Sequence, residues 1–308
     1  MTILHALIPI FVIILFGYGL KASGFPGDDF WEPAKRITYY ILFPSLLFHN
    51  LSTAQLGDYP LFQMSMAVGG AILILTALVL FLKEKIGADN PSFTSIIQGS
   101  IRMNTYLGIS AAASLFGQEG ITLAALNLAI IIPLVNVVCV AVLTHYTEDQ
   151  SPKSPVQSIL QTSRSLLTNP LILACSAGIL FNALDMSLPV SLHEIFKILG
   201  RASLPLGLLA VGSGLNFSSM HSTKRLVLLT SSFKLLCLPA ITTMTCLLLG
   251  IEGKTLAVAI LFSALPASPS SYILAHQMGG NQQLMASILT VEIALSALSL
   301  SVILSMLV

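Results

Sequence analysis

Long apolar segments, separated by short polar ones, follow one another along the whole chain. Most of them approach the ~20 residues that an α-helix needs to cross the hydrocarbon core of a bilayer. The pattern therefore predicts an all-α membrane protein with ten spanning helices. These helices are expected at residues 3–20, 34–51, 61–82, 93–116, 121–145, 169–184, 192–215, 226–249, 256–276 and 284–307.

The composition agrees with this pattern, because 55% of the 308 residues are hydrophobic and only 9% are charged. A soluble domain of this length does not need so much apolar surface, so the lipid bilayer is the expected partner. The net charge of +1 and the lack of a basic patch with interleaved aromatics argue against a nucleic-acid partner. All four cysteines lie inside apolar segments, which favours small buried side chains over a disulfide or zinc framework.

The longest polar segment, residues 147–167, reads as a connector between residues 1–146 and residues 168–308. Lys and Arg concentrate in the cytoplasmic loops of membrane proteins and so indicate the orientation. With the N-terminus outside, the cytoplasmic loops hold nine of the 14 Lys and Arg, and the outer loops hold only Lys254. The nine are Lys21, Lys35, Arg36, Lys83, Lys85, Lys153, Arg164, Lys224 and Arg225. Ten spans then place both termini on the extracytoplasmic side.

The two halves of the chain repeat their helix-breaking residues at one offset. An offset of 161 residues separates Pro9 from Pro170, Gly17 from Gly178, and Pro44 from Pro205. Since five spans per half is an odd number, the second half must insert upside down relative to the first. Inverted repeats of this kind are typical of secondary transporters.

Two apolar segments are interrupted in corresponding places. Pro266 and Pro269 remove two backbone donors from segment 256–276 and disfavour helical geometry before each proline. A simple proline kink is the alternative to a full break. The repeat places the counterpart near residue 104, where the polar, glycine-bearing stretch 102–110 interrupts segment 93–116. Two broken helices at equivalent positions predict a binding site with fixed dipoles and free backbone groups.

Four stretches of the chain resemble the auxin efflux carrier family. They are residues 40–48, 102–108, 265–268 and 275–281. Bacterial members of this family look like organic-acid permeases. The resemblance implies two inverted five-helix repeats in which the broken helices four and nine cross, as in a sodium/proton antiporter-like fold. It also implies a core of helices 3–5 and 8–10 and a bacterial inner-membrane location. The scaffold would be helices 1, 2, 6 and 7, with Pro44, Ser45 and Pro205. The short connector and the lack of a proline beside Asn104 argue against auxin as the substrate.

The two interruptions supply the candidate substrate-binding residues. These are Asn104, Thr105, Tyr106 and Gly108 in the first, and Pro266, Ser268, Pro269, Ser270 and Ser271 in the second. Amide and hydroxyl groups there, with the amides at half-helix N-termini, would suit a carboxylate. The alternative for each hydroxyl is a hydrogen bond back to its own helix.

Three ionisable residues lie deep in apolar segments: Arg102, Lys234 and Glu292. Charges at such depth usually pair with one another or serve function. Glu292 is the candidate proton carrier because it is the carboxylate near the centre of a predicted span. A permanent ion pair with Lys234 or Arg102 is the equal alternative.

These features together predict a secondary transporter of small organic anions, with dicarboxylates such as malate or malonate as candidates. A Na⁺- or H⁺-coupled symporter or antiporter of the same fold, a non-transporting receptor, and an enzyme are the alternatives. No Walker-type loop, metal-ligand spacing or catalytic set is apparent, so no catalytic residue, metal or cofactor is expected beyond a coupling ion, H⁺ or Na⁺. A homodimer remains an open alternative for the assembly.

Overall fold

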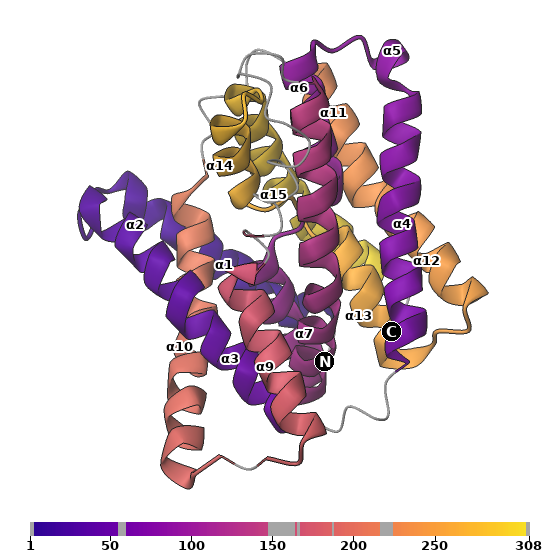
Figure 1. The fold of residues 1–308 in the computed structure, drawn as a ribbon. Helices are drawn as coiled ribbons and strands as arrows, with labels where there is room; N and C mark the ends of the chain where they lie inside the picture. Colours follow the sequence, from indigo (N-terminus) through magenta and orange to yellow (C-terminus); the bar gives the residue numbers. More distant parts are fainter. Residues whose placement is uncertain are drawn as a thin grey trace. The chain divides into compact units, whose positions relative to one another are not determined.

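The computed structural model describes residues 3–54, 60–146, 164, 167–186, 188–215 and 224–305. The regular elements of these residues are helices, and no strand occurs among them (Figure 1). The α-helices are α1 (Ile3–Ala22), α2 (Asp28–Ile37), α3 (Phe43–Ser52), α4 (Leu61–Phe81), α5 (Lys83–Ile86), α6 (Asn90–Ile101), α7 (Thr105–Tyr146), α9 (Pro170–Ala183), α10 (Val190–Ser213), α11 (Lys224–Ser232), α12 (Leu238–Leu248), α13 (Gly253–Ala264), α14 (Ser270–Gln277) and α15 (Gln282–Ser305). Two π-helical turns, η1 (Thr38–Leu42) and η4 (Phe233–Cys237), join α2 to α3 and α11 to α12.

Every predicted apolar segment coincides with helix, and most bounds agree within a few residues. Within the described residues, six helical stretches are by length and composition long and apolar enough to cross a membrane: His5–Ala22, Phe62–Phe81, Asn90–Tyr146, Val190–Ser213, Lys224–Leu248 and Gln282–Ser305. The longest of them, Asn90–Tyr146, contains both α6 and α7. Within α7, Gly117 adopts a left-handed conformation (φ 59°) and separates two helical parts, as the sequence led us to expect between residues 116 and 121. Nearly all of the predicted connector, residues 147–167, lies outside the described residues.

The chain forms two compact units. Unit 1 comprises Met1–Leu61, Tyr106–Ala129 and Leu167–Gly214, and unit 2 comprises Phe62–Thr105, Ile130–Leu166 and Leu215–Val308. The boundary between the two units runs through α7. The expected boundary between the two sequence repeats was instead the connector at residues 147–167. The assignment of whole helices to a scaffold and a core stays a prediction.

Unit 1 is built on two close helix contacts, α1 with α10 and α3 with α9. A Cβ on Gly17 of α1 would lie 2.3 Å from the carbonyl oxygen of Leu209, and one on Gly178 of α9 would lie 3.1 Å from that of Phe48. The two glycines are separated by 161 residues, and so are the two residues that they contact. Small residues of this kind allow backbones in membranes to approach closely.

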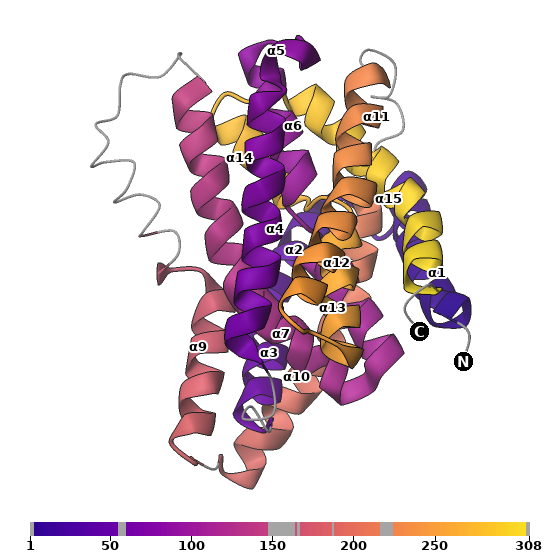
Figure 2. The same cartoon turned by 90° about the vertical axis from the view of Figure 1, so that its right-hand side faces the viewer.

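Unit 2 contains α4, α6 and the helices from α11 to α15. Its helix α4 runs alongside α12, where the Thr245 hydroxyl donates to the Ala67 carbonyl at 3.0 Å (Figure 2). The π turn η4 lies just before Pro239, as η1 lies just before Pro44 in unit 1. A proline ring clashes with the carbonyl four residues earlier, and the wider π turn relieves that clash. Lys234 lies in this turn and is fully buried.

Substitution of Gly17 by alanine is expected to destabilise unit 1, because the new methyl group has no room beside the Leu209 carbonyl. We expect a loss of about 1–3 kcal/mol, typical of overpacking, seen as a lower thermal unfolding midpoint in detergent. Gly19→Ala in the same helix is the matched control, since nothing lies within 4 Å of its Cβ position. Equal midpoints for the two variants would contradict the close contact.

Candidate functional site: a crossing of two broken helices

The first break lies between α6 and α7. Helix α6 ends at Ile101, Arg102 is extended (φ −75°, ψ 153°), and helical geometry resumes at Thr105. The interruption expected near residue 104, within stretch 102–110, is therefore present and occupies residues 102–104. No proline marks this break, and Arg102, its first residue, makes the side-chain contacts described below.

The second break lies between α13 and α14. Leu265 is extended (φ −65°, ψ 148°), as expected for a residue before proline, and α14 starts directly after Pro269. The five residues from Leu265 to Pro269 are not helical. The alternative of a simple proline kink is therefore wrong.

The two breaks satisfy each other's backbone. The Asn104 N–H donates to the Pro266 carbonyl at 2.8 Å. The Ala267 N–H donates to Oε2 of Glu292, on α15, at 2.7 Å. All four residues are buried, where an unpaired amide would cost free energy. The crossing thus joins α6, α13 and α15, with α14 leaving it beside α6 and α15 (Figure 1).

Arg102 links the first break to α14. Its Nη1 donates to Oδ1 of Asn136 and its Nη2 to the hydroxyl of Ser270, both at 2.9 Å. Its Nε has no nitrogen or oxygen partner among the described residues, and the guanidinium also interacts with the buried Cys139 thiol. The cation is 9% exposed, so the guanidinium is held in one orientation at the N-terminal end of α14.

The backbone amides at this end of α14 are already engaged. The amides of Ser271 and Tyr272 donate to the carbonyls of Ser268 and Pro269 at 2.9 and 3.2 Å. The Ser268 and Ser270 hydroxyls form a hydrogen bond of 2.9 Å. The donors that remain beside the break are Nε of Arg102 and the hydroxyl of Ser271, which is buried and bonds to no described residue. An anion at this end of α14 would therefore meet side-chain donors, and binding by half-helix amides stays a prediction.

Glu292 and Lys234 are both fully buried in unit 2. The two charges attract each other, but Oε1 of Glu292 and Nζ of Lys234 have no hydrogen-bond partner within the described ranges. No salt bridge joins the two side chains in the described part of the chain, and the choice between proton carrier and structural partner stays a prediction. Glu292 binds the break itself through Ala267.

The other predicted residues are distributed over both units. Thr105 is the first residue of α7 and belongs to unit 2, whereas Tyr106 and Gly108 belong to unit 1. The Tyr106 ring lies 4.7 Å from that of Phe43, centroid to centroid. The scaffold residues Pro44, Ser45 and Pro205 are also in unit 1, and the Ser45 hydroxyl bonds back to its own helix at the Ile41 carbonyl.

Three residues of unit 2 were not singled out from the sequence. Asn136 accepts from Arg102 and was visible as the one polar residue in the apolar run 129–142. Gln98 is fully buried, and neither atom of its amide has a partner among the described residues. Asn281 caps α15 through the Leu284 amide and bonds to Ser92 at the start of α6, so this part of the family-like stretch 275–281 has a structural role.

The fold and site define a multi-pass membrane protein with interrupted helices, an arrangement typical of carriers. Residues 2–304 match the membrane transport protein family, which is the auxin efflux carrier family. The chain belongs to this family, and the resemblance seen in its sequence is confirmed. An uncharacterized transporter of Methanothermobacter thermautotrophicus is 24% identical over 300 residues, which cover 96% of this chain and 95% of that protein. Membership of this family supports transport over catalysis.

A double-mutant cycle on Glu292 and Lys234 is expected to show strong coupling. Glu292→Ala leaves the Ala267 amide unsatisfied and Lys234 uncompensated, so Lys234→Met should cost less free energy in that background. We expect a coupling energy of about 0.5–3 kcal/mol from unfolding in detergent. The solvent-exposed pair Glu194 and Lys197, at 2.9 Å, is the control and should couple more weakly, because water and salt screen it. Additive effects at the buried pair would contradict the interaction.

Proposed function

We propose that this protein is a secondary transporter of small organic anions, with dicarboxylates such as malate or malonate as the candidate substrates. The observation that carries the proposal is the fixed guanidinium of Arg102 at the break. It holds a buried cation against the Ser270 hydroxyl, which in turn bonds to the Ser268 hydroxyl. A carboxylate matches both the charge and the donors.

The expected affinity suits a carrier, which must release what it binds. A hydrogen bond to a charged group contributes about 1.5–3 kcal/mol. Two or three such contacts, less the cost of immobilising the ligand, correspond to dissociation constants from about micromolar to millimolar. Neutral polar groups around a single cation therefore bind an anion without trapping it.

The proposed architecture is a pair of inverted five-helix repeats with ten membrane crossings. Two contacts in unit 1 support this architecture: Gly17 packs against Leu209, and Gly178 packs against Phe48. Gly178 lies 161 residues after Gly17, and Leu209 lies 161 residues after Phe48, so each contact is the repeat equivalent of the other. Alternating access would then move the crossing between the two faces of a bacterial inner membrane. The Lys and Arg distribution favours both termini outside.

Substitution of Ser271 by alanine is expected to weaken substrate binding about tenfold or more, since one charge-assisted hydrogen bond is lost. The fold should be retained, because this hydroxyl bonds to no described residue. The measurement is the KM for malate uptake into proteoliposomes that contain only the purified protein. Ser263→Ala is the matched control: its buried hydroxyl in α13 bonds back to the Ile260 carbonyl at 2.8 Å. An unchanged KM in Ser271→Ala would place the substrate elsewhere, and no flux of any carboxylate in the wild type would favour the receptor alternative.

Coupling to protons is the second candidate function, and one contact favours it. The Glu292 carboxylate accepts the Ala267 amide at the break, so protonation would weaken a charge-assisted bond on which the crossing depends. Proton binding and the geometry of the site would thereby be linked. The nearby Lys234 ammonium opposes binding of Na⁺ to the same carboxylate.

Glu292→Gln is expected to abolish malate uptake driven by a pH gradient while leaving malate counterflow measurable. Glutamine can still accept the Ala267 amide but cannot carry a proton. Glu252→Gln is the control, because Glu252 lies outside the crossing, at the residue before α13. Full pH-driven uptake in the Glu292 variant would exclude this residue as the carrier, and loss of counterflow as well would indicate a structural role.

A further inference from the structure

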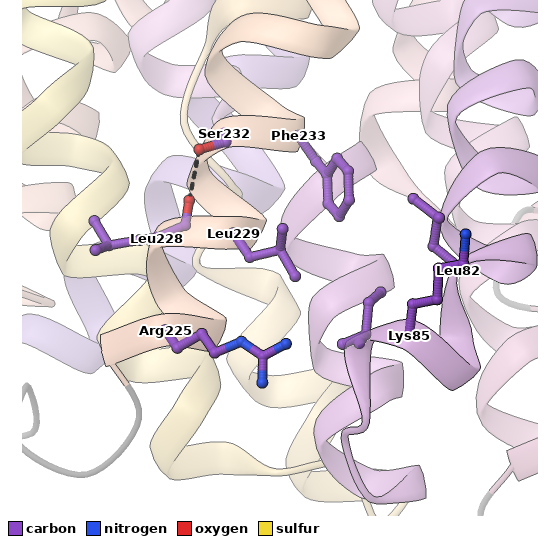
Figure 3. A pocket seen from close by; sticks show the side chains of 8 residues that line it. Leu82, Lys85, Arg225, Leu228, Leu229, Ser232 and Phe233 are labelled. Atoms are coloured by element: carbon purple, nitrogen blue, oxygen red, sulfur yellow. Dashed lines mark hydrogen bonds between the residues drawn. The ribbon is translucent and has the colours of Figure 1, made fainter.

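A groove of about 430 Å³ opens between the end of α4 with α5 and the start of α11 with η4, all within unit 2 (Figure 3). One wall carries Leu82 and Lys85, and the other carries Arg225, Leu228, Leu229 and Phe233. Two of these residues are cations, and no acidic residue lines the groove. The groove is separate from the crossing and has no part in the proposed transport mechanism.

Both cations are free to meet a ligand. Lys85 and Arg225 are exposed, and neither forms an ion pair with any residue that the structure describes. Their neighbour Lys83 is different, since its ammonium lies 3.8 Å from the centre of the Tyr146 ring. Figure 3 shows the Arg225 guanidinium reaching from α11 into the gap below Leu229 and Phe233.

The groove has cations at one end and apolar side chains farther along, as a phospholipid has a charged headgroup followed by apolar acyl chains. Lys85 follows the candidate membrane span Phe62–Phe81 and Arg225 lies at the start of the candidate span Lys224–Leu248. We therefore expect both cations where a bilayer changes from hydrocarbon to headgroups. Leu228, Leu229 and Phe233 follow one to two turns deeper along the same stretch, and Leu228 is 57% exposed. A free anion would bind the two cations but would make no favourable contact with these apolar side chains.

We propose that this groove binds an anionic phospholipid, with its phosphate at Lys85 and Arg225 and an acyl chain along Leu228 and Leu229. The orientation proposed above puts the groove at the cytoplasmic leaflet. Basic pockets between membrane helices on that side are known to hold anionic headgroups. The lipid would lie against α4 and α11 and so join two helices of unit 2 at one end.

The test uses the purified full-length protein in a non-ionic detergent, titrated with phosphatidylglycerol or phosphatidylcholine, with bound lipid counted by native mass spectrometry. Phosphatidylglycerol should bind at least about fivefold more tightly. Lys85→Gln and Arg225→Gln should each weaken its binding about fivefold and leave phosphatidylcholine binding unchanged. Lys224→Gln is the matched control, because it removes an adjacent exposed charge that does not line the groove. Leu228→Ser should weaken binding of both lipids.

Three results would overturn the proposal. Equal binding of the two lipids would remove the headgroup selectivity, and equal effects of Arg225→Gln and Lys224→Gln would indicate diffuse surface charge. Displacement of phosphatidylglycerol by millimolar inorganic phosphate would indicate a site for a free anion. Misfolding is monitored separately: thermal unfolding without added lipid should be the same in all variants, since the substituted side chains are exposed.

Discussion

The need to satisfy backbone groups inside an apolar protein governs unit 2. Each of the two broken helices exposes amides and carbonyls that hydrocarbon cannot bind. They are satisfied by each other and by one side chain: Asn104 donates to Pro266, and Ala267 donates to Glu292. Neither break can close into a regular helix without leaving the other unpaired, so the two interruptions stabilise one another.

The three buried ionisable residues of unit 2 differ in how well they are satisfied. Arg102 makes two hydrogen bonds that fix its orientation, Glu292 makes one, and Lys234 makes none with the described residues. Each such charge costs about 2.5–3.5 kcal/mol at the centre of a membrane helix. Two of the incompletely satisfied groups are the ones we propose for function: Nε of Arg102 for the substrate, and Oε1 of Glu292 for a proton.

The two units use different packing chemistry. Unit 1 brings α1 against α10 and α3 against α9 through glycines, with backbone atoms almost in contact. Both units bury amides and hydroxyls, but among the described residues the buried charged side chains, Arg102, Lys234 and Glu292, are all in unit 2. Close backbone packing suits a rigid body, and buried polar groups suit a binding site.

Much of this protein is determined by local sequence. The apolar segments predicted the helices, and Pro266 and Pro269 predicted the second break, because hydrophobic period and proline geometry act within a few residues. Tertiary structure decided the contacts of the first break, where the Arg102 side chain reaches Asn136 and Ser270, far away in the chain. It also decided that the α14 amides are engaged and that Glu292 binds Ala267. Hydrogen-bond partners so distant in sequence are chosen by helix packing, which no local pattern records.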